Sequence, residues 1–441
     1  MEERFDCIVV GGGIAGLSAA MVLARADKRF LLIERGEFCG AKNVSGGVLW
    51  GSDLERLVPG YSGDDDAEFE RFVGHRRLTF MDDQSTFSVD FKSDHFHRKP
   101  YSGIIVLRAR FDEWLAGRVQ QAIDESAIPG ESFLATNVLV DRLLMEQGKV
   151  TGIEAGGERF LADCVIIAEG INNLLTRQIG LQSEYVPADH VAVGVKEVIG
   201  LDRDVLEERF QLSGRSGFTC EFVGYATRGV EGGGFLYTNT ESISIGLVLG
   251  MKDLREKGLR PYDILNDFKT HPAVADMIRG GDVLEYSAHV VSTGDIGSMP
   301  ERLYADGVLI AGEAAHLLMN SGRAIQGMDY AMRSGILAAE TVIAAADAGG
   351  FGAETLRGYQ DRLEESFVLK DLRSFQDAVH VLHDPVMYQK VPNLLCDFGR
   401  SFFTVRSEPT DRAAKTFRKT ARKHVSTWEL VKLAIKAARS L

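Results

Sequence analysis

The 441-residue chain has little cysteine, little proline and no long run of apolar residues. Its five cysteines include no Cys-x-x-Cys pair, so we expect no iron–sulfur cluster or zinc ion held by four cysteines of this chain. A sparse, odd number of cysteines also excludes a disulfide scaffold and is typical of a reducing compartment. No stretch reaches the roughly 18 apolar residues that a membrane-spanning helix needs, and no signal peptide is readable. These absences predict a cytoplasmic protein.

Positive charge is scarce over most of the chain. The net charge is −13, from 50 Lys and Arg against 63 Asp and Glu, which argues against nucleic acid as a partner. Residues 405–441 are the exception, because they carry ten Lys or Arg residues and only three acids. Their net charge of +7, against −20 for the rest, marks the C-terminal end as a separate surface element.

Glycine is abundant, at 47 residues, and its first cluster is informative. Gly11, Gly13 and Gly16 form the pattern G-x-G-x-x-G, directly after an apolar strand-like run and at the start of an alanine-rich helical stretch. A second strand-like run then ends at Glu34. The glycines allow a tight turn, a close backbone approach to a pyrophosphate and helix–strand packing, while the acid can bind a ribose hydroxyl. The pattern therefore predicts a dinucleotide site at the start of the helix.

Three later segments resemble elements of glutathione-reductase-type flavoproteins. Residues 306–316 are similar to the second FAD fingerprint of that family, in which an acid after glycine holds the ribityl chain; Gly312 and Glu313 take these places, although the acid is usually aspartate. Residues 164–170 resemble a strand and glycine that pass the FAD. Arg108 begins an Arg-x-x-Phe-Asp element whose arginine lies beside the cofactor in the family. The resemblance implies FAD, held non-covalently because no attachment motif is evident.

Further motifs narrow the resemblance. Residues 40–51, Gly-Ala-Lys-Asn-Val-Ser-Gly-Gly-Val-Leu-Trp-Gly, suit backbone that passes beneath a flavin ring. Together with 190–200, 232–239 and 285–289, this stretch is similar to the electron-transfer-flavoprotein:quinone oxidoreductase family, and in particular to its bacterial Fix-type (FixC-like) branch. The likeness extends over about residues 5–384. Geranylgeranyl reductases are relatives that share the same fold.

The resemblance implies an α/β fold with a discontiguous FAD-binding Rossmann domain of the glutathione-reductase type. An antiparallel-sheet domain for substrate or quinone and a helical C-terminus complete it. We expect the FAD-binding domain at 1–60, 130–180 and 295–345. We expect the antiparallel sheet at 61–129 and 181–294, and helices with a basic amphipathic tail at 346–441.

The fingerprints and the resemblance together predict one set of cofactor-binding residues. These are Gly11, Gly13, Ile14, Ala15, Gly16, Glu34, Arg35, Lys42, Ser45, Gly46, Arg108, Val138, Gly170, Gly312, Glu313, Ala324 and Ile325. His316 follows the second fingerprint, and we hypothesise a hydrogen bond near the flavin ring. No catalytic acid–base pair, nucleophile or metal-ligand set is evident, which assigns the chemistry to the flavin.

The resemblance implies an FAD-dependent electron-transfer oxidoreductase. Electrons would arrive from an electron transfer flavoprotein and leave for a quinone or a small ferredoxin-like iron–sulfur protein. Mammalian-type members carry a four-cysteine cluster module that this chain lacks, and in the Fix-type branch a separate ferredoxin-like protein supplies it. The alternatives are a geranylgeranyl (prenyl) reductase and a flavin-free lipid-binding protein of related fold. Because only one G-x-G-x-x-G has a strand–helix setting, NAD(P)H is not expected to reduce the flavin directly.

The basic C-terminal end begins its last helix at a capping box, Ser426-Thr-Trp-Glu429. One broad face of that helix is apolar, and Lys432, Lys436 and Arg439 line the opposite side. Such a helix can lie on an anionic membrane or bind an acidic partner. We hypothesise an external contact, either peripheral on the inner face of the cell membrane or with the ferredoxin-like protein. The alternative is a helix packed on the protein's own core.

Overall fold

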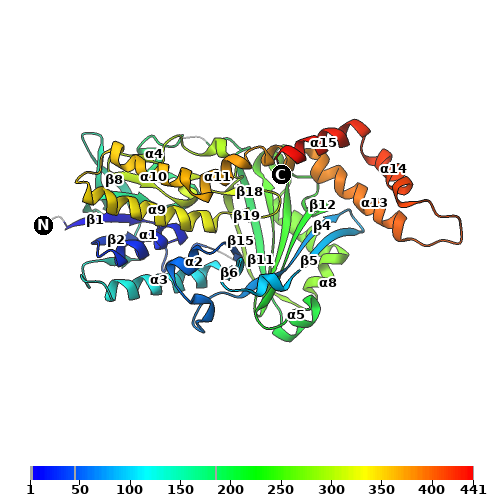
Figure 1. Ribbon diagram of the computed structural model, residues 1–441, viewed down its shortest axis with the longest axis horizontal. Helices are drawn as coiled ribbons and strands as arrows, with labels where there is room; N and C mark the ends of the chain where they lie inside the picture. The colour runs from blue at the N-terminus through cyan, green and yellow to red at the C-terminus, as the bar shows by residue number, and fades with distance from the viewer. Residues whose placement is uncertain (1–2, 44–45, 184–185, 441) are drawn as a thin grey trace.

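The structure is a computed structural model that describes residues 3–43, 46–183 and 186–440. It consists of two lobes, each built around one β-sheet, and a helical arm that extends from the second lobe (Figure 1). The predicted α/β fold with a helical C-terminal region is confirmed. Ser45, one of the predicted cofactor-binding residues, lies outside the described residues.

An eight-stranded sheet forms the centre of the first lobe. Its strands are β1 (Glu3–Val10), β2 (Phe30–Ile33), β7 (Phe133–Ala135), β8 (Val140–Glu146), β9 (Lys149–Ala155), β10 (Glu158–Ile167), β16 (Tyr304–Ala305) and β17 (Val308–Ile310). The spatial order is β16-β17-β10-β1-β2-β7, and the strands from β17 to β7 run parallel. The last four residues of β1 are all buried, as expected for a central parallel strand with helices on both faces.

Helices pack on this sheet and share one hydrophobic core with it. They are α1 (Ile14–Arg25), α2 (Asp53–Leu57), α3 (Arg108–Asp124), α4 (Leu174–Gln178), α9 (Met328–Asp347), α10 (Ala353–Glu365) and α11 (Phe367–Ser374). The closest approach is between α1 and α9, where a Cβ on Gly335 would lie 2.0 Å from the carbonyl oxygen of Ala15. Glycine at this position lets the two helix backbones touch.

A nine-stranded sheet forms the second lobe. Its strands are β3 (Gly46–Trp50), β4 (Arg71–Met81), β5 (Thr86–Lys92), β6 (Gly103–Leu107), β11 (Val191–Gly200), β12 (Ser216–Gly224), β13 (Gly232–Thr238), β14 (Ser242–Gly250) and β15 (Asp282–Ser292). The order is β15-β11-β14-β13-β12-β4-β6-β3, with β5 paired to β4, and among the described strands of this second sheet only the β12–β4 pair is parallel. Short helices accompany the sheet: α5 (Arg203–Phe210), α6 (Met251–Lys257), α7 (Pro261–Thr270) and α8 (Pro272–Ile278).

The packing differs from the expected division of the chain in three places. Helix α3 comes from the segment 61–129, but it buries Phe111 and Leu115 in the first core rather than in the antiparallel lobe. Helices α10 and α11, from 346–441, also belong to the first core. Strand β3, from 1–60, lies in the second sheet instead. Each of these elements buries its one apolar side where a neighbour offers a complementary one, whatever its position in the sequence.

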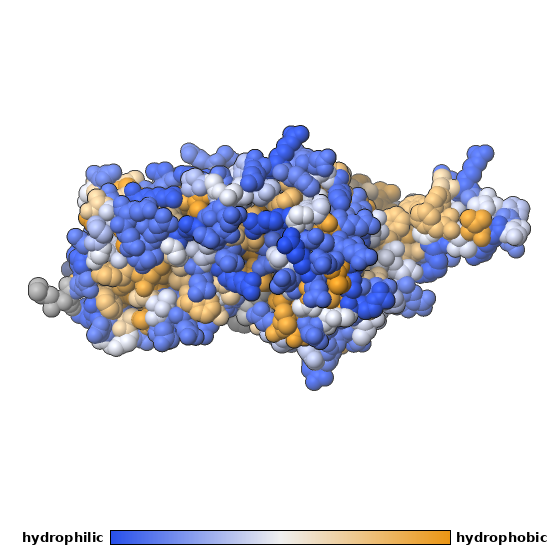
Figure 2. All heavy atoms as spheres, turned by 90° about the horizontal axis from the view of Figure 1, so that it is seen from below, coloured by the Kyte–Doolittle hydropathy of each residue, from blue (hydrophilic) through white to orange (hydrophobic). Residues whose placement is uncertain are grey.

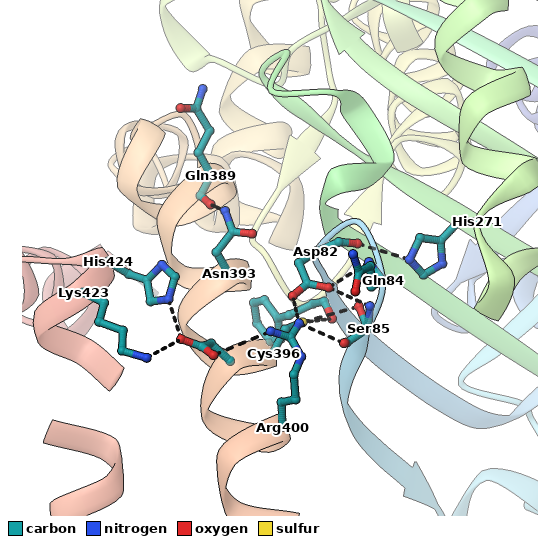
Figure 3. Close-up of polar contacts among 12 residues, drawn as sticks. Asp82, Gln84, Ser85, His271, Gln389, Asn393, Cys396, Arg400, Lys423 and His424 are labelled. Carbon is teal, nitrogen blue, oxygen red and sulfur yellow. Dashed lines mark hydrogen bonds and ion pairs between the residues drawn. The ribbon is translucent and has the colours of Figure 1, made fainter. Parts of the chain in front are cut away.

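The arm is built mainly from α13 (Val391–Phe403) and α14 (Ala413–His424), after the short α12 (Ala378–Leu382), and α15 (Thr427–Ser440) returns toward the second lobe (Figure 1). Polar contacts fasten α13 to the β4–β5 hairpin, as Figure 3 shows: Arg400 pairs with Asp82 and donates to the Ser85 hydroxyl at 3.0 Å. Asp397, one turn earlier on the same side of α13, pairs with Arg400 at 3.6 Å and binds His424 at 3.0 Å, which holds α14.

Helix α15 begins at the predicted capping box, which the structure confirms. The backbone N–H of Ser426 donates to the Glu429 carboxylate at 2.8 Å, and the N–H of Glu429 donates to the Ser426 hydroxyl at 3.2 Å. Among residues 3–43, 46–183 and 186–440, none of the helices is long and apolar enough to span a membrane.

We predict that Gly335→Ala destabilises the protein and that Gly358→Ala does not. The new methyl group at Gly335 would collide with the Ala15 carbonyl oxygen, whereas at Gly358, in α10, a Cβ meets open space within the described structure. Overpacking costs about 1–3 kcal/mol, and Gly to Ala in an exposed helix gains up to about 1 kcal/mol. Thermal unfolding should therefore occur at a lower temperature for Gly335→Ala and at an equal or higher one for Gly358→Ala. Equal midpoints for the two variants would contradict the α1–α9 contact.

Candidate functional site

A cavity of about 410 Å³ opens at the carboxyl ends of β1, β2 and β10 and reaches the second sheet. This end of a parallel sheet, next to the first βα turn, is where nucleotides bind in α/β folds. The cavity walls come from both lobes, with the glycine turn on one side and strands β11, β13 and β15 on the other. Segments far apart in the sequence thus meet at one site.

The glycine turn presents backbone N–H groups to the cavity. Gly11 has φ +112°, which favours glycine, and a Cβ on Gly16 would lie 1.9 Å from the Gly11 carbonyl oxygen, so the turn and α1 touch directly. Gly13 is different, because the nearest described atom to a Cβ there is the Arg108 Nη2, 3.9 Å away. Gly13 is also the N-cap and has no side chain to satisfy the first N–H groups of α1. This open, positive helix end fits a diphosphate.

Glu34 lies at the end of β2 and binds the same turn. Its Oε2 accepts the N–H of Gly12 at 2.8 Å and its Oε1 accepts the N–H of Gly36 at 2.6 Å. Each carboxylate oxygen retains a second lone pair, which can accept a ribose hydroxyl. Glu34 and Arg35 both line the cavity. Glu34 can therefore stabilise the glycine turn and bind a ribose at the same time.

Arg108 begins α3 and reaches the cavity beside Gly13. Its guanidinium forms two hydrogen bonds to Asp112, at 3.0 and 2.7 Å, and Asp112 is fully buried. Asp112 also accepts the side-chain N–H of Asn43 at 2.7 Å. This carboxylate therefore fixes the orientation of Arg108 and ties the loop before β3 to α3.

Glu313 lies at the start of a short helical turn after β17 and lines the cavity. Its Oε1 accepts the backbone N–H of Ser292, at the end of β15, at 3.3 Å. Burial raises the pKa of Glu313 above its usual value, while Arg108 and Lys196 oppose the shift. The side chain is placed to accept or donate a hydrogen bond where the two lobes meet.

Most of the predicted cofactor-binding residues lie on this one cavity. Those that line it are Gly11, Gly13, Ile14, Ala15, Glu34, Arg35, Lys42, Gly46, Arg108, Val138, Gly170, Glu313 and Ile325. Gly16 and Gly312 lie behind the lining and contact Gly11 and Ala15 instead, so their role is packing. The Ala324 carbonyl accepts the N–H of Ser321 in a turn, also outside the lining.

His316 does not line the cavity, so the geometry does not support the hypothesised contact with the ring. Its positive φ of 55° turns the side chain into the first lobe, where Nε2 lies 2.9 Å from the Asn173 amide and 3.1 Å from that of Gln182. Burial, followed by His190, lowers the pKa of His316 to about 4. It is a neutral, buried packing residue.

Sequence reasoning missed the side chains that the second sheet contributes. Lys196 in β11, Phe235 and Tyr237 in β13, and His289 in β15 all line the cavity. The strands themselves stood out in the sequence, but the pattern did not show which alternate residues face the cofactor side. Because side chains alternate between the two faces of a strand, one residue known to face the cofactor would have identified the others on that face.

Comparisons with known proteins agree with this geometry. Residues 6–121 match the family model described as FAD dependent oxidoreductase, and 191–291 match the ubiquinone-binding model of ETF-QO. Residues 378–441 match the C-terminal domain of the ETF-QO/FixC family. The ubiquinone-binding match coincides with strands β11–β15.

Relatives cover nearly the whole chain. Protein FixC of Salmonella typhi is 42% identical over 404 residues, 92% of this chain and 91% of the relative. A probable electron transfer flavoprotein-quinone oxidoreductase, YdiS of Escherichia coli (strain K12), is 39% identical over 443 residues and 100% of both chains. A geranylgeranyl bacteriochlorophyll reductase-like structure from Thermoplasma acidophilum has a TM-score of 0.73 at 19% identity, covering 99% of this chain and 100% of the other. The myxobacterial halogenase CndH has a TM-score of 0.66 at 17% identity, covering 97% and 92%. These two structures show a shared fold.

The turn, the acid and the cavity, together with these matches, define an FAD-dependent oxidoreductase. Within that class, the chain belongs to the ETF-QO/FixC family, as the motifs predicted. The residues present fit FAD, because open space lies in front of Gly13 at a positive helix end and a carboxylate stands at the end of β2.

We predict that Gly13→Ala weakens FAD binding but leaves the fold intact. The methyl group would enter the space in front of the helix end, and alanine at an N-cap costs only about 1 kcal/mol. The affinity for FAD should fall at least about tenfold, or about 1.4 kcal/mol, in a titration of the apo-protein. Gly16→Ala is the matched variant, because its methyl group collides with Gly11 and should lower the unfolding temperature of the apo-protein as well. A Gly13→Ala protein that is purified with full FAD would refute the diphosphate assignment.

Proposed function

We propose that this protein accepts electrons from an electron transfer flavoprotein and passes them through FAD to a quinone. One observation carries this proposal: a single cavity joins the dinucleotide turn to the sheet that matches the ubiquinone-binding model. The names of the relatives support the same donor and acceptor classes. Bound FAD supplies the electron-transfer chemistry.

The residues of the chain bind and orient the cofactor. The start of α1 and Arg108 would hold the diphosphate, Glu34 the ribose and Glu313 the ribityl chain. Met328 begins α9 at the cavity, after Gly327, so the positive end of this long helix can stabilise negative charge on a bound ring. The apolar part of the walls would keep water from a bound ring.

We propose in addition that a separate, small ferredoxin-like iron–sulfur protein is a partner, and that this chain holds no such cluster. The distribution of the cysteines supports this. Cys7 and Cys164 are neighbours on β1 and β10, whereas the other three cysteines lie in different parts of the fold and all five are buried. Four thiolates therefore do not converge within the described structure.

The last proposal is a peripheral contact of the arm with the inner face of the cell membrane. Figure 2 shows apolar surface along the arm, at the right of the view. Phe403, Val405 and Trp428 are 74%, 93% and 75% exposed. The same segments of the chain carry exposed basic residues, of which Lys415 and Lys419 pair with Asp411: Arg406, Lys415, Arg418, Lys419, Arg422 and Lys432. Exposed apolar side chains together with basic residues suit the interface of an anionic bilayer.

We predict that a reduced electron transfer flavoprotein, and not NADPH, reduces the bound flavin. In anaerobic stopped-flow mixing, the flavin absorbance should fall with the reduced flavoprotein and return when a ubiquinone analogue is added. Excess NADPH should leave the flavin oxidised over seconds, since the single dinucleotide turn is assigned to FAD. Rapid bleaching by NADPH alone would instead favour a reductase of the prenyl-reductase class. The apo-protein, from which FAD has been removed, serves as the flavin-free control.

We predict that Phe403→Ser weakens binding to anionic vesicles while the flavin content is unchanged. Vesicles of phosphatidylglycerol and phosphatidylcholine are sedimented with the holoprotein, and the bound fraction should fall several-fold and decrease further at high salt. Met145→Ser is the matched control, because Met145 is also exposed but lies on β8 in the first lobe, away from the arm (Figure 1). If both variants bind like the unmodified protein, the membrane proposal is wrong.

A further inference from the structure

Lys196 is a charged side chain in the cavity that the binding scheme above does not use. It lies on β11, and its neighbour across the sheet is Gly246. A Cβ on Gly246 would lie 2.7 Å from the Lys196 Cβ and 2.5 Å from the Phe235 ring. Glycine at 246 therefore gives the lysine stem and the ring room to lie side by side on the cavity wall.

The Lys196 ammonium has no hydrogen bond or ion pair to any of the described residues. The adjacent Glu197 shows the contrast: it faces the other side of the sheet and pairs with Lys269 at 2.7 Å. Lys196 is half-buried, and a partly desolvated ammonium without a partner is unfavourable in a folded protein. Its position on the cavity wall indicates that a bound molecule supplies the missing partner.

The charged and titratable groups that face Lys196 come from three elements. They are Arg108 on α3, Glu285 and His289 on β15, and Glu313 after β17. Burial lowers the pKa of Lys196 to about 8, with Arg108 acting in the same direction and the two glutamates opposing it. Burial, then Lys196 and Arg108, lower the pKa of His289 to about 4. At neutral pH the histidine is thus uncharged, and Lys196 is a cation close to its titration range.

We propose that the Lys196 ammonium contacts the bound FAD and compensates the negative charge that remains on it after reduction. Two electrons from the reduced flavoprotein and one proton from solvent leave one extra negative charge on the cofactor. The ammonium keeps its own proton and stabilises that charge electrostatically. This inference rests on the proposed function only in that FAD binds in the cavity.

The test is a potentiometric titration of the flavin in the purified holoprotein. Lys196→Met keeps the length of the stem and removes the charge, so reduced FAD should be stabilised about tenfold less, a potential lower by about 30 mV for a two-electron couple. Lys196→Arg keeps the charge and should restore the potential. Lys252→Met removes an exposed lysine on α6, outside the cavity lining, and should leave the potential unchanged.

The pH dependence gives a second readout. Because the cation stabilises the reduced state, reduction raises the pKa of Lys196 above about 8. The difference in potential between the unmodified protein and Lys196→Met should be constant below pH 8. It should shrink as the pH rises through the raised pKa, whereas the difference between Lys196→Arg and Lys196→Met persists.

Two results would overturn the inference. If Lys196→Met weakens the binding of oxidised FAD but keeps the potential, the lysine binds the diphosphate instead. If it lowers only the unfolding temperature of the apo-protein, the role is structural. Neither result depends on the electron donor or the quinone. If the proposed donor or acceptor is wrong, only the stopped-flow experiment will show it. A lower potential that Lys196→Arg restores supports the inference even when that experiment fails.

Discussion

Helix α1 is held at its N-terminal end by three contacts that only glycine permits. Gly16 touches the Gly11 carbonyl, Gly335 of α9 touches the Ala15 carbonyl, and Gly312 lies against the Ala15 methyl group. Any side chain at these positions would push α1 away from β1 or α9. The contacts therefore fix the free N–H groups of the first turn relative to the parallel sheet, and every other part of the cofactor site is positioned around that helix end.

Asp112 in turn fixes the position of Arg108 on the cavity wall. It is fully buried, and it accepts hydrogen bonds from Arg108 and Asn43. Removal of Arg108 would leave the buried carboxylate without its counter-ion, and the typical cost of such a loss is about 3–5 kcal/mol. The cavity lining carries Arg35, Lys42, Arg108 and Lys196 against Glu34, Glu169 and Glu313, although the net charge of the chain is −13. The attraction for an anionic cofactor therefore depends on where single cations and helix ends lie, and not on the charge of the whole protein.

The sequence predicts the local part of this site well and the non-local part poorly. Gly11 and Glu34 belong to one βαβ unit, whose spacing is set by the tight turn, so the pattern alone places them. Lys196 and His289 face the cavity because of the register and curvature of the second sheet. Neither property can be predicted from the sequence pattern of the residues between them. His316 shows the same limit at short range, since a left-handed backbone conformation turned it away from a cavity that its neighbour Glu313 reaches.

The orientation of α15 argues against a helix that merely completes the core. Two of its charged side chains bind the body: Glu429 binds Lys390 at 2.7 Å and Lys436 binds Asp384 at 3.2 Å. Its apolar residues Trp428, Val431 and Ile435 are exposed, although Leu430 of the same helix packs on the small cluster at the base of the arm. A core helix buries such residues, because apolar burial is the main favourable term in packing. The fold leaves this apolar face in solvent, on an arm that is rich in basic residues and fastened by a few ion pairs. Contact with an external surface would bury that face.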